Sequence, residues 1–362
     1  MNIAFVNSTR KWGGVKTWCI DTATALKELN INSIIFGKDK RFIDRATQRK
    51  IESHPIKFGP DYNPILIYKL YSFFKKRKIQ FVVANVGKDI KSAGIAARIA
   101  GIPLIVHIGS PGDIKNKFEN KILHFFTKPV FVCCSEYTKS GFLKNVPYAK
   151  KFKIAAIHPG TEISKHEIQT NNTLKIITTS QLNKDKRHID VLEACKILAD
   201  RKLKFFLNII GEGALSAELK VLVQKLGLTD RVFFSGYVND VTTELRAADI
   251  FILPSQCEPL GIALEEAMAN GLVPIARNAG GAPEIWPEFL ASHLLPSESR
   301  GAEFAEILST LLHRPWQEIH ELKNRVRDHA AQTFSIELQT KKFLDFMLSS
   351  RHDASLQKNK HL

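Results

Sequence analysis

The chain has 362 residues, 44% of them hydrophobic, a composition typical of soluble globular proteins and long enough for two or three domains. No segment approaches about 18 consecutive apolar residues and the first residues enter a strand pattern directly, which argues against a membrane span or a signal region and predicts a cytoplasmic protein. The five cysteines are scattered, odd in number and without metal-ligand spacing, so reduced thiols are expected. The formal net charge of +16 favours an anionic partner.

Short apolar runs of strand type alternate with helical patterns along the chain, which predicts parallel sheets covered by helices in two doubly wound domains. We place the first domain at residues 1–165 and the second at 166–335, joined through a polar stretch at 160–173. A last helix is expected at 336–350, and the polar, basic residues 351–362 are predicted to be disordered. The expected strands are 3–7, 33–36, 81–85, 104–107, 130–134 and 154–157 in the first domain, and 175–178, 205–210, 232–234, 250–253 and 273–276 in the second.

Two places in the first domain have the features of a ligand site. Gly13 and Gly14 follow the first strand and precede a helical pattern, so the backbone there can approach a ligand and present free amides, although a glycine pair also occurs in simple turns. Trp12 and Lys16 lie beside them and are candidates for contacting an acceptor. His107 ends a strand, at the edge where open α/β sheets bind their ligands.

The second domain contains a strand, a loop and a helix with a carboxylate on either side of the helix start. Glu258 lies in the loop after the strand and Glu266 lies in the helix, so the two are separated by roughly 10 Å, close to the distance between the sugar and the ribose of a nucleotide diphosphate sugar. Pro259 is expected in the first helical turn and Asn270 at the helix end. The helix start between the carboxylates can receive phosphate.

This segment continues into Gly271-Leu272-Val273-Pro274 and Gly280-Gly281-Ala282-Pro283-Glu284, and the whole run resembles the donor-site signature of retaining GT-B glycosyltransferases. That family includes lipopolysaccharide core, mannosyl and sucrose-forming enzymes. The resemblance implies two Rossmann-like domains that face a cleft, with an acceptor domain first, a nucleotide-sugar donor domain second and a C-terminal helix that crosses back to the N-terminal domain.

The resemblance also implies residue roles. Glu258 would hold hydroxyls of the donor sugar, Lys186 would neutralise the leaving diphosphate, and His107 would lie near the transferred sugar, which makes these three the expected catalytic residues. The expected donor-binding residues are Gly13, Gly14, Gln181, Gly211, Glu212, Tyr237, Val238, Leu260, Gly261, Ile262 and Glu266, of which Glu266 would bind the ribose. The expected acceptor-binding residues are Trp12, Lys16 and Asp113.

One residue departs from the family pattern. Gln181 stands where the family usually has an arginine beside the lysine, and a neutral amide cannot compensate the charge on a leaving diphosphate. Lys184, Arg187 or a basic residue of the first domain would have to substitute, or the donor is unusual.

The charge is concentrated in the first domain. Residues 1–165 contain 29 Lys and Arg against 11 Asp and Glu, a net charge of +18, while the remainder has a net charge of −2. Residues 64–78 join aliphatic and aromatic side chains to four terminal cations, which suits a helix at an anionic membrane surface and equally a helix packed on the sheet with a basic last turn.

These observations favour a retaining hexosyltransferase that transfers from a UDP- or GDP-linked sugar to a glycolipid or saccharide at the cytoplasmic membrane face, as in lipopolysaccharide biosynthesis. The chain has no Asp-x-Asp sequence, so neither a metal nor another cofactor is expected. The alternatives are transfer to a soluble acceptor, a nucleotide-sugar epimerase and a non-catalytic sugar-nucleotide binding protein. Nucleic-acid binding is the least supported, because no known binding module is present.

Overall fold

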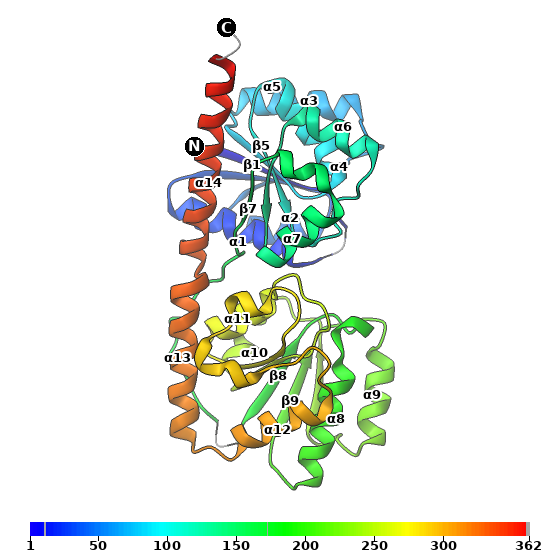
Figure 1. Ribbon diagram of the computed structural model, residues 1–362, viewed down its shortest axis with the longest axis vertical. Helices are drawn as coiled ribbons and strands as arrows, with labels where there is room; N and C mark the ends of the chain where they lie inside the picture. The colour runs from blue at the N-terminus through cyan, green and yellow to red at the C-terminus, as the bar shows by residue number, and fades with distance from the viewer. Residues whose placement is uncertain (11, 172, 360–362) are drawn as a thin grey trace. The chain divides into compact units, whose positions relative to one another are not determined.

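The computed structural model describes residues 1–10, 12–171 and 173–359, with the backbone alone for 352–359. The chain forms two compact units (Figure 1). Unit 1 comprises Met1–Gly160 together with the stretch from Ile336 onward, and unit 2 comprises Thr161–Ser335. The boundary at Gly160 lies at the start of the predicted linker, five residues before the boundary expected from the sequence.

Unit 1 is built on a seven-stranded parallel sheet with the strand order β3-β2-β1-β4-β5-β6-β7. Its central strands are buried on both faces, which is why they read as continuous apolar runs in the sequence. The strands are β1 (Asn2–Asn7), β2 (Asn32–Gly37), β3 (Glu52–Pro55), β4 (Phe81–Ala84), β5 (Leu104–Ile108), β6 (Val130–Cys133) and β7 (Ile154–Ala156).

Helices cover both faces of this sheet and form two apolar layers. The first layer packs α3, α5, α6 and α7 on one face, and the second packs α1, α2 and α14 on the other. The helices are α1 (Gly14–Glu28), α2 (Lys40–Gln48), α3 (Pro64–Lys76), α4 (Gly87–Asp89), α5 (Ile95–Ala100), α6 (Phe118–Thr127), α7 (Glu136–Asn145) and α14 (Ile336–Asn359).

The C-terminal helix α14 belongs to unit 1, as the resemblance implied. Phe343 and Met347 are buried in the second layer, and the Phe343 ring packs edge-on against Trp18 of α1 at 5.6 Å between centroids. Figure 1 shows α14 alongside α1. Residues 351–359, for which the sequence predicted disorder, form the last turns of α14, where no proline or glycine stops the helix, and 360–362 lie outside the described residues.

Unit 2 contains a six-stranded parallel sheet with the order β10-β9-β8-β11-β12-β13. Its strands are β8 (Lys175–Thr179), β9 (Phe206–Ile210), β10 (Val232–Gly236), β11 (Ile250–Leu253), β12 (Val273–Arg277) and β13 (Leu294–Leu295). Its helices are α8 (His188–Asp200), α9 (Ser216–Lys225), α10 (Thr242–Arg246), α11 (Ile262–Ala269), α12 (Gly301–Leu312) and α13 (Trp316–Phe334).

Two buried ion pairs connect the elements of unit 2. The Lys323 ammonium of α13 donates to Asp249 at 2.9 Å and to the Ala248 carbonyl, and Asp249 also accepts from the Lys175 amide at the start of β8. Arg277 at the end of β12 pairs with Asp190 of α8. All four charged side chains are at most 2% exposed, so each charge depends on its partner.

The strands predicted from the sequence are all present, and two short edge strands were missed. β3 has the polar sequence Glu-Ser-His-Pro, which lacks an apolar run, and β13 has two residues. The prediction that Pro259 lies in the first helical turn is wrong: α11 begins at Ile262, because Gly261 takes a left-handed conformation with φ of 105° and sets the helix start there. Within the described residues, no helix combines the length and apolarity needed to cross a bilayer.

Candidate functional site

In unit 2, the loops that follow β8 and β11 bring Lys186 and Glu258 together. The Lys186 ammonium donates to the Glu258 carboxylate at 2.6 Å, and both side chains remain partly exposed, at 19% and 15%. The two loops are also joined through their backbones, because the Gln256 amide donates to the Asp185 carbonyl. Two expected catalytic residues, 72 positions apart in sequence, thus lie in direct contact at the carboxyl edge of the sheet.

A glycine loop after β12 holds the backbone of Glu258. The Gly281 amide donates to the Glu258 carbonyl at 2.9 Å. Gly280 has φ of 67°, and a Cβ atom placed there would lie 1.8 Å from that same carbonyl oxygen. The close approach of these two loops therefore requires glycine at position 280, and it fixes the backbone from which the Glu258 side chain extends.

The start of α11 lies between the two carboxylates of the motif. No side chain caps this helix, so its first backbone amides and its positive dipole end are available to an anion. A Cβ atom at Gly261 would lie 3.3 Å from Glu258 Cγ, and Gly261 is buried with Leu260, whereas Ile262 is half-buried. Glu266 is half-buried in the second turn, one turn closer to the helix start than the sequence suggested.

Two further loops that the sequence singled out, those after β9 and β10, meet the loop after β8 at the same edge. Gly211 has φ of 135° and its Cα lies against the Ser180 carbonyl, so that a side chain would collide with it at 1.9 Å. The Leu182 amide donates to the Glu212 carbonyl, and the Gly211 amide donates to the Gly236 carbonyl. The loops after β8, β9 and β10 therefore form one continuous rim, on which Tyr237 is exposed and Val238 is half-buried.

The structure narrows the set of residues that could supply the positive charge of the arginine that the family usually has at position 181. Gln181 is exposed and its amide oxygen accepts from Asn183. Arg187 is held by two hydrogen bonds to Asp190, which is itself paired with Arg277, so its guanidinium is already committed. Lys184 is exposed and makes no ion pair among the described residues, which leaves it as the free cation of this loop.

In unit 1, His107 is buried at the end of β5 and its ring stacks on Trp18 with centroids 3.8 Å apart. Asn7 and Cys19 donate to the Asn85 amide oxygen, which leaves the Asn85 amide nitrogen to face His107 Nδ1 at 3.5 Å. Burial lowers the pKa of His107 to about 3, so the ring is neutral. A neutral ring that accepts at Nδ1 carries its proton on Nε2, and this buried nitrogen has no partner among the described residues.

Asp113 closes the loop after β5. Its carboxylate accepts from the amides of Gly109 and Ser110 at 2.8 and 2.9 Å, and burial raises its pKa. Gly109 in turn packs on Val15 of α1. Asp113 therefore holds the loop that begins next to His107, which is a structural role. Its contact with the acceptor stays a prediction.

The glycine turn before α1 is open to solvent. Gly13 and Gly14 are exposed, no side chain caps the helix, and a Cβ atom at Gly13 would meet nothing within 4 Å. Trp12 packs partly on the core under the Arg45 guanidinium. Lys16, in contrast, is 1% exposed and paired with Asp39 at 2.7 Å, so an acceptor could reach its amine only if this pair opened.

Sequence reasoning missed a buried polar network next to His107. Asp89 accepts from the Ser8, Asn85 and Val86 amides and thereby joins the loops after β1 and β4. Burial raises the pKa of Asp89 to about 6 in spite of these donors. The one sequence signal was a polar residue at the end of each of two predicted buried strands, Asn7 and Asn85, at the edge where ligands bind.

Comparisons with known proteins agree with this architecture. Residues 161–333 match the family model described as "Glycosyl transferases group 1". The chain is 28% identical over 240 residues to the UDP-Gal:alpha-D-GlcNAc-diphosphoundecaprenol alpha-1,3-galactosyltransferase of Escherichia coli, an alignment that covers 59% of this chain and 62% of that protein. It is 28% identical over 321 residues to an uncharacterized glycosyltransferase of Haemophilus influenzae, covering 86% and 90% of the two chains.

Solved structures share the fold over nearly the whole length. A glycosyltransferase from Rickettsia africae has a TM-score of 0.78 and 20% identity and covers 96% of this chain and 97% of its own. The Anabaena protein HepE, crystallised with UDP and glucose, has a TM-score of 0.78 and 21% identity, covering 96% and 99% of the two chains. Residues 161–333 thus match the group 1 family model, and the chain has the two Rossmann-like domains of the GT-B fold.

Proposed function

We propose that this protein is a retaining glycosyltransferase that moves a hexose from a nucleotide diphosphate sugar to a glycolipid or saccharide acceptor. The observation that carries the proposal is the contact between Lys186 and Glu258 beside the uncapped start of α11. A cation and a helix start suit a diphosphate, while a carboxylate suits sugar hydroxyls, and the three lie on adjacent loops. The group 1 domain that includes all three supports this assignment.

The residues of unit 2 divide between the two ends of the donor. Glu258 would accept hydrogen bonds from sugar hydroxyls, Lys186 and the start of α11 would stabilise the diphosphate, and Glu266 would bind the ribose. The structure of HepE with UDP-glucose and the UDP-galactose named for the E. coli relative make a UDP-linked hexose the favoured donor. No metal is assigned a role, because Lys186, Lys184 and the helix start supply positive charge to the leaving group.

The reaction would break the bond between the anomeric carbon and the phosphate oxygen and form one between the same carbon and the acceptor oxygen. The acceptor proton would pass to the departing phosphate on the same face, so that the donor's anomeric configuration is retained. The unpartnered Nε2–H of His107 would donate a hydrogen bond to a sugar oxygen, a role that a neutral imidazole can fill at any ordinary pH.

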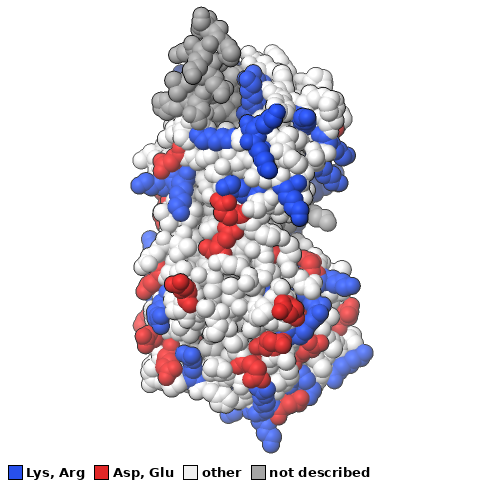
Figure 2. Space-filling model, in the orientation of Figure 1, with Lys and Arg blue, Asp and Glu red and all other residues white. Residues whose placement is uncertain are grey.

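The surface of unit 1 supports a proposal for the acceptor and for the location of the protein. Lys and Arg side chains dominate the face of unit 1 drawn in Figure 2, whereas both signs are mixed over unit 2. α3 packs its Leu70 and Phe74 on the sheet but leaves Ile65 and Tyr68 exposed. α6 exposes four large apolar side chains on one face, and lysines lie within and next to that helix. These are Phe118, Ile122, Phe125 and Phe126, with Lys115, Lys117, Lys121 and Lys128.

Exposed apolar side chains among cations suit the interface of an anionic membrane. We therefore propose peripheral binding at the cytoplasmic membrane face and a lipid-linked acceptor of the lipopolysaccharide core type. The E. coli relative, whose named acceptor is a diphosphoundecaprenol-linked sugar, supports this choice. Transfer to a soluble acceptor is the second candidate, and it is favoured by the packing of α3 on the sheet.

The test begins with donor binding and ends with product analysis. Thermal shifts with UDP-, GDP- and ADP-sugars identify the donor, and transfer is then measured for Glu258→Gln, Lys186→Met and the control Lys196→Met, which removes a lysine from a surface ion pair of α8. We expect about 100-fold slower transfer for the first two, since each removes a contact to the reacting sugar or the leaving group, and no change for the control.

Four outcomes would contradict the proposal. Unchanged transfer by Glu258→Gln would remove the assigned sugar contact. An isomerised donor formed without acceptor would identify an epimerase, and donor binding without hydrolysis or transfer would identify a binding protein. A product of inverted anomeric configuration, detected by NMR, would exclude the retaining mechanism.

A further inference from the structure

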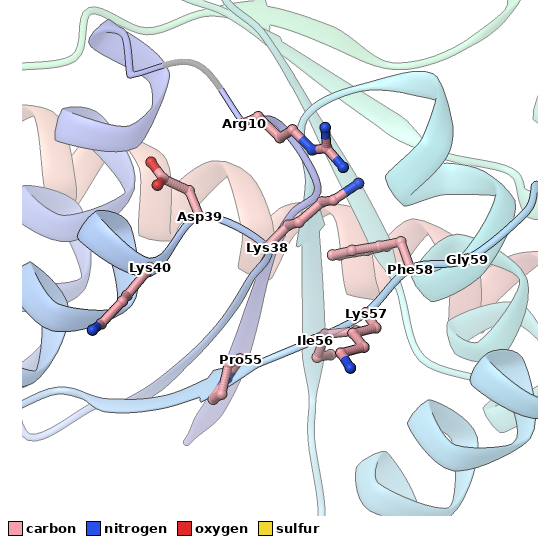
Figure 3. Close-up of a pocket in the computed structure, with 9 residues that line it drawn as sticks. All are labelled: Arg10, Lys38, Asp39, Lys40, Pro55, Ile56, Lys57, Phe58 and Gly59. Carbon is pink, nitrogen blue, oxygen red and sulfur yellow. The ribbon is translucent and has the colours of Figure 1, made fainter.

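Unit 1 contains a pocket, with a volume of about 710 Å³, at the carboxyl edge of its sheet. Its walls come from the residues that follow three neighbouring parallel strands, β1, β2 and β3, and from the first residues of α2 (Figure 3). This is the edge at which open α/β sheets bind ligands, and the size is in the range of small-molecule sites, roughly 300–1,000 Å³. None of the sequence motifs pointed to it.

The pocket is strongly basic. It is lined by Arg10, Lys38, Lys40 and Lys57, none of which forms an ion pair with a carboxylate among the described residues. In Figure 3 the Arg10 and Lys38 side chains extend to the same side, with their nitrogen ends next to each other, while the Lys40 amine points away from them. Two adjacent cations without an intervening carboxylate repel each other, and an anion between them relieves this repulsion.

The single acidic residue of the lining, Asp39, does not offset this charge. Its carboxylate is neutralised by the Lys16 ammonium, which is buried behind it at 2.7 Å. Figure 3 shows the Asp39 carboxylate directed away from Arg10 and Lys38. The buried pair therefore keeps the one negative group of the pocket turned from the ligand side, and it explains why a lysine is buried in α1.

The pocket walls are held in place by the backbone. The Lys38 amide donates to the Asn7 carbonyl at 3.3 Å and the Ile56 amide donates to the Gly37 carbonyl at 2.8 Å, which extends the strand ladder into the lining loops. Phe58 is 1% exposed and fixes the third loop in the core. The nine-residue helix α2 starts at Lys40 with no side-chain cap, which adds the positive end of a helix dipole.

We infer that this pocket binds the phosphate or diphosphate group of the acceptor. A guanidinium next to an ammonium at a helix start is the donor set that recognises phosphate. The inference rests on the proposed function, in which the donor diphosphate is bound by unit 2, so that a phosphate site in unit 1 is assigned to the acceptor. The acceptor class is thus a phosphate-linked or diphosphate-linked saccharide rather than a neutral one.

The first experiment locates the site without relying on transfer. Pyridoxal 5′-phosphate condenses through its aldehyde with lysine amines, releasing water, and borohydride reduces the imine to a stable amine that peptide mass spectrometry maps. We expect saturating inorganic pyrophosphate to lower labelling of Lys38 about tenfold and to leave labelling unchanged at Lys144, an exposed lysine of α7, a helix that packs on β5, β6 and β7 at the other end of the sheet. In the Arg10→Gln variant, about tenfold more pyrophosphate should be needed to protect Lys38 to the same extent. Equal labelling of Lys38 with and without pyrophosphate would overturn the inference.

The second experiment separates the two sources of phosphate. If phosphatidylglycerol vesicles protect Lys38 while pyrophosphate and phosphatidylcholine vesicles do not, the pocket binds the bilayer surface and the acceptor assignment is wrong. With one sugar presented as a diphosphate-linked acceptor and as a methyl glycoside, Arg10→Gln with Lys38→Met should raise KM at least tenfold for the first acceptor only. An equal effect on both would overturn the inference. Failure of all transfer would refute the proposed function, whereas the labelling result would stand.

Discussion

Glu265 provides the sharpest test of the structure of unit 2, because it is a buried carboxyl group that has no partner. It lies in the first turn of α11, is 0% exposed, and neither carboxylate oxygen has a hydrogen-bond partner among the described residues. Burial, together with the neighbouring Glu266, raises the pKa of Glu265 well above its ordinary value of 4.5. The folded protein therefore keeps this group protonated at a pH where the unfolded chain releases the proton.

The sign of the effect on stability follows from proton binding. Above about pH 4.5 the folded state holds a proton that the unfolded state has lost, so the free energy of unfolding falls as pH rises until the folded carboxyl ionises too. Each pH unit in this window costs about 1.4 kcal/mol. The variant Glu265→Gln has no such proton, so its stability relative to the wild type should increase with pH above about pH 4.5, by up to about 1.4 kcal/mol for each pH unit over which the folded carboxyl stays protonated.

The assay is urea unfolding at a series of pH values, followed by tryptophan fluorescence and circular dichroism. The control is Glu218→Gln in α9, a glutamate that is exposed and should show the same pH dependence as the wild type. Parallel curves for Glu265→Gln and the wild type would refute the reasoning, because they would mean that Glu265 is ionised in the folded state.

Four further predictions concern the ion pairs, the glycine loop, the buried histidine and the metal. Lys323→Met leaves the Asp249 charge buried without its partner and should lower the free energy of unfolding by about 3–5 kcal/mol in urea titrations. Gly280→Ala would place a Cβ atom against the Glu258 carbonyl, so donor affinity measured by calorimetry should fall while the far-UV spectrum is kept. The pKa of His107 is lowered to about 3 in the folded state, so below about pH 6.5 only the unfolded state binds a proton on this ring. The free energy of unfolding should therefore fall by about 1.4 kcal/mol from about pH 7.5 to about pH 5.5, and urea titrations of His107→Gln should lack this loss. Transfer should persist in excess EDTA, and a full loss restored by Mg²⁺ or Mn²⁺ would contradict the assignment of Lys186 to the diphosphate.

Most of the fold could be predicted because buried parallel strands appear in the sequence as continuous apolar runs. Ile250 to Leu253 and Ile3 to Val6 are fully buried stretches of this kind, and each was placed within one residue. β3 was not predicted because a strand at the edge of a sheet does not require apolar residues on both faces. The start of α11 was misplaced because Pro259 suits a helical turn, while the left-handed backbone at Gly261 cannot be read from the residue type alone.

The candidate site was predicted where a loop follows a strand and missed where contacts connect distant residues. Glu258 and Lys186 were identified through the resemblance and are in contact in the structure. The pairing of Lys16 with Asp39 depends on how α1 packs against the end of β2, which no local pattern encodes. The basic pocket lined by Arg10 and Lys38 was not predicted for the same reason, since these two residues are brought together only by the order of the strands.

The ion pairs of unit 2 differ in burial in a way that matches their proposed tasks. Lys323 with Asp249 and Arg277 with Asp190 are almost fully buried, and opening either would leave a charge without water or partner, at a cost of about 3–5 kcal/mol. Lys186 with Glu258 is partly exposed, so water replaces part of what is lost, and opening it costs less than opening either buried pair. A donor that takes the lysine with its diphosphate and the glutamate with its hydroxyls offers each group a new partner. The pair that the proposed function requires to open is therefore the one that opens at the lowest cost, and the deeply buried pairs would keep the surrounding loops in place meanwhile.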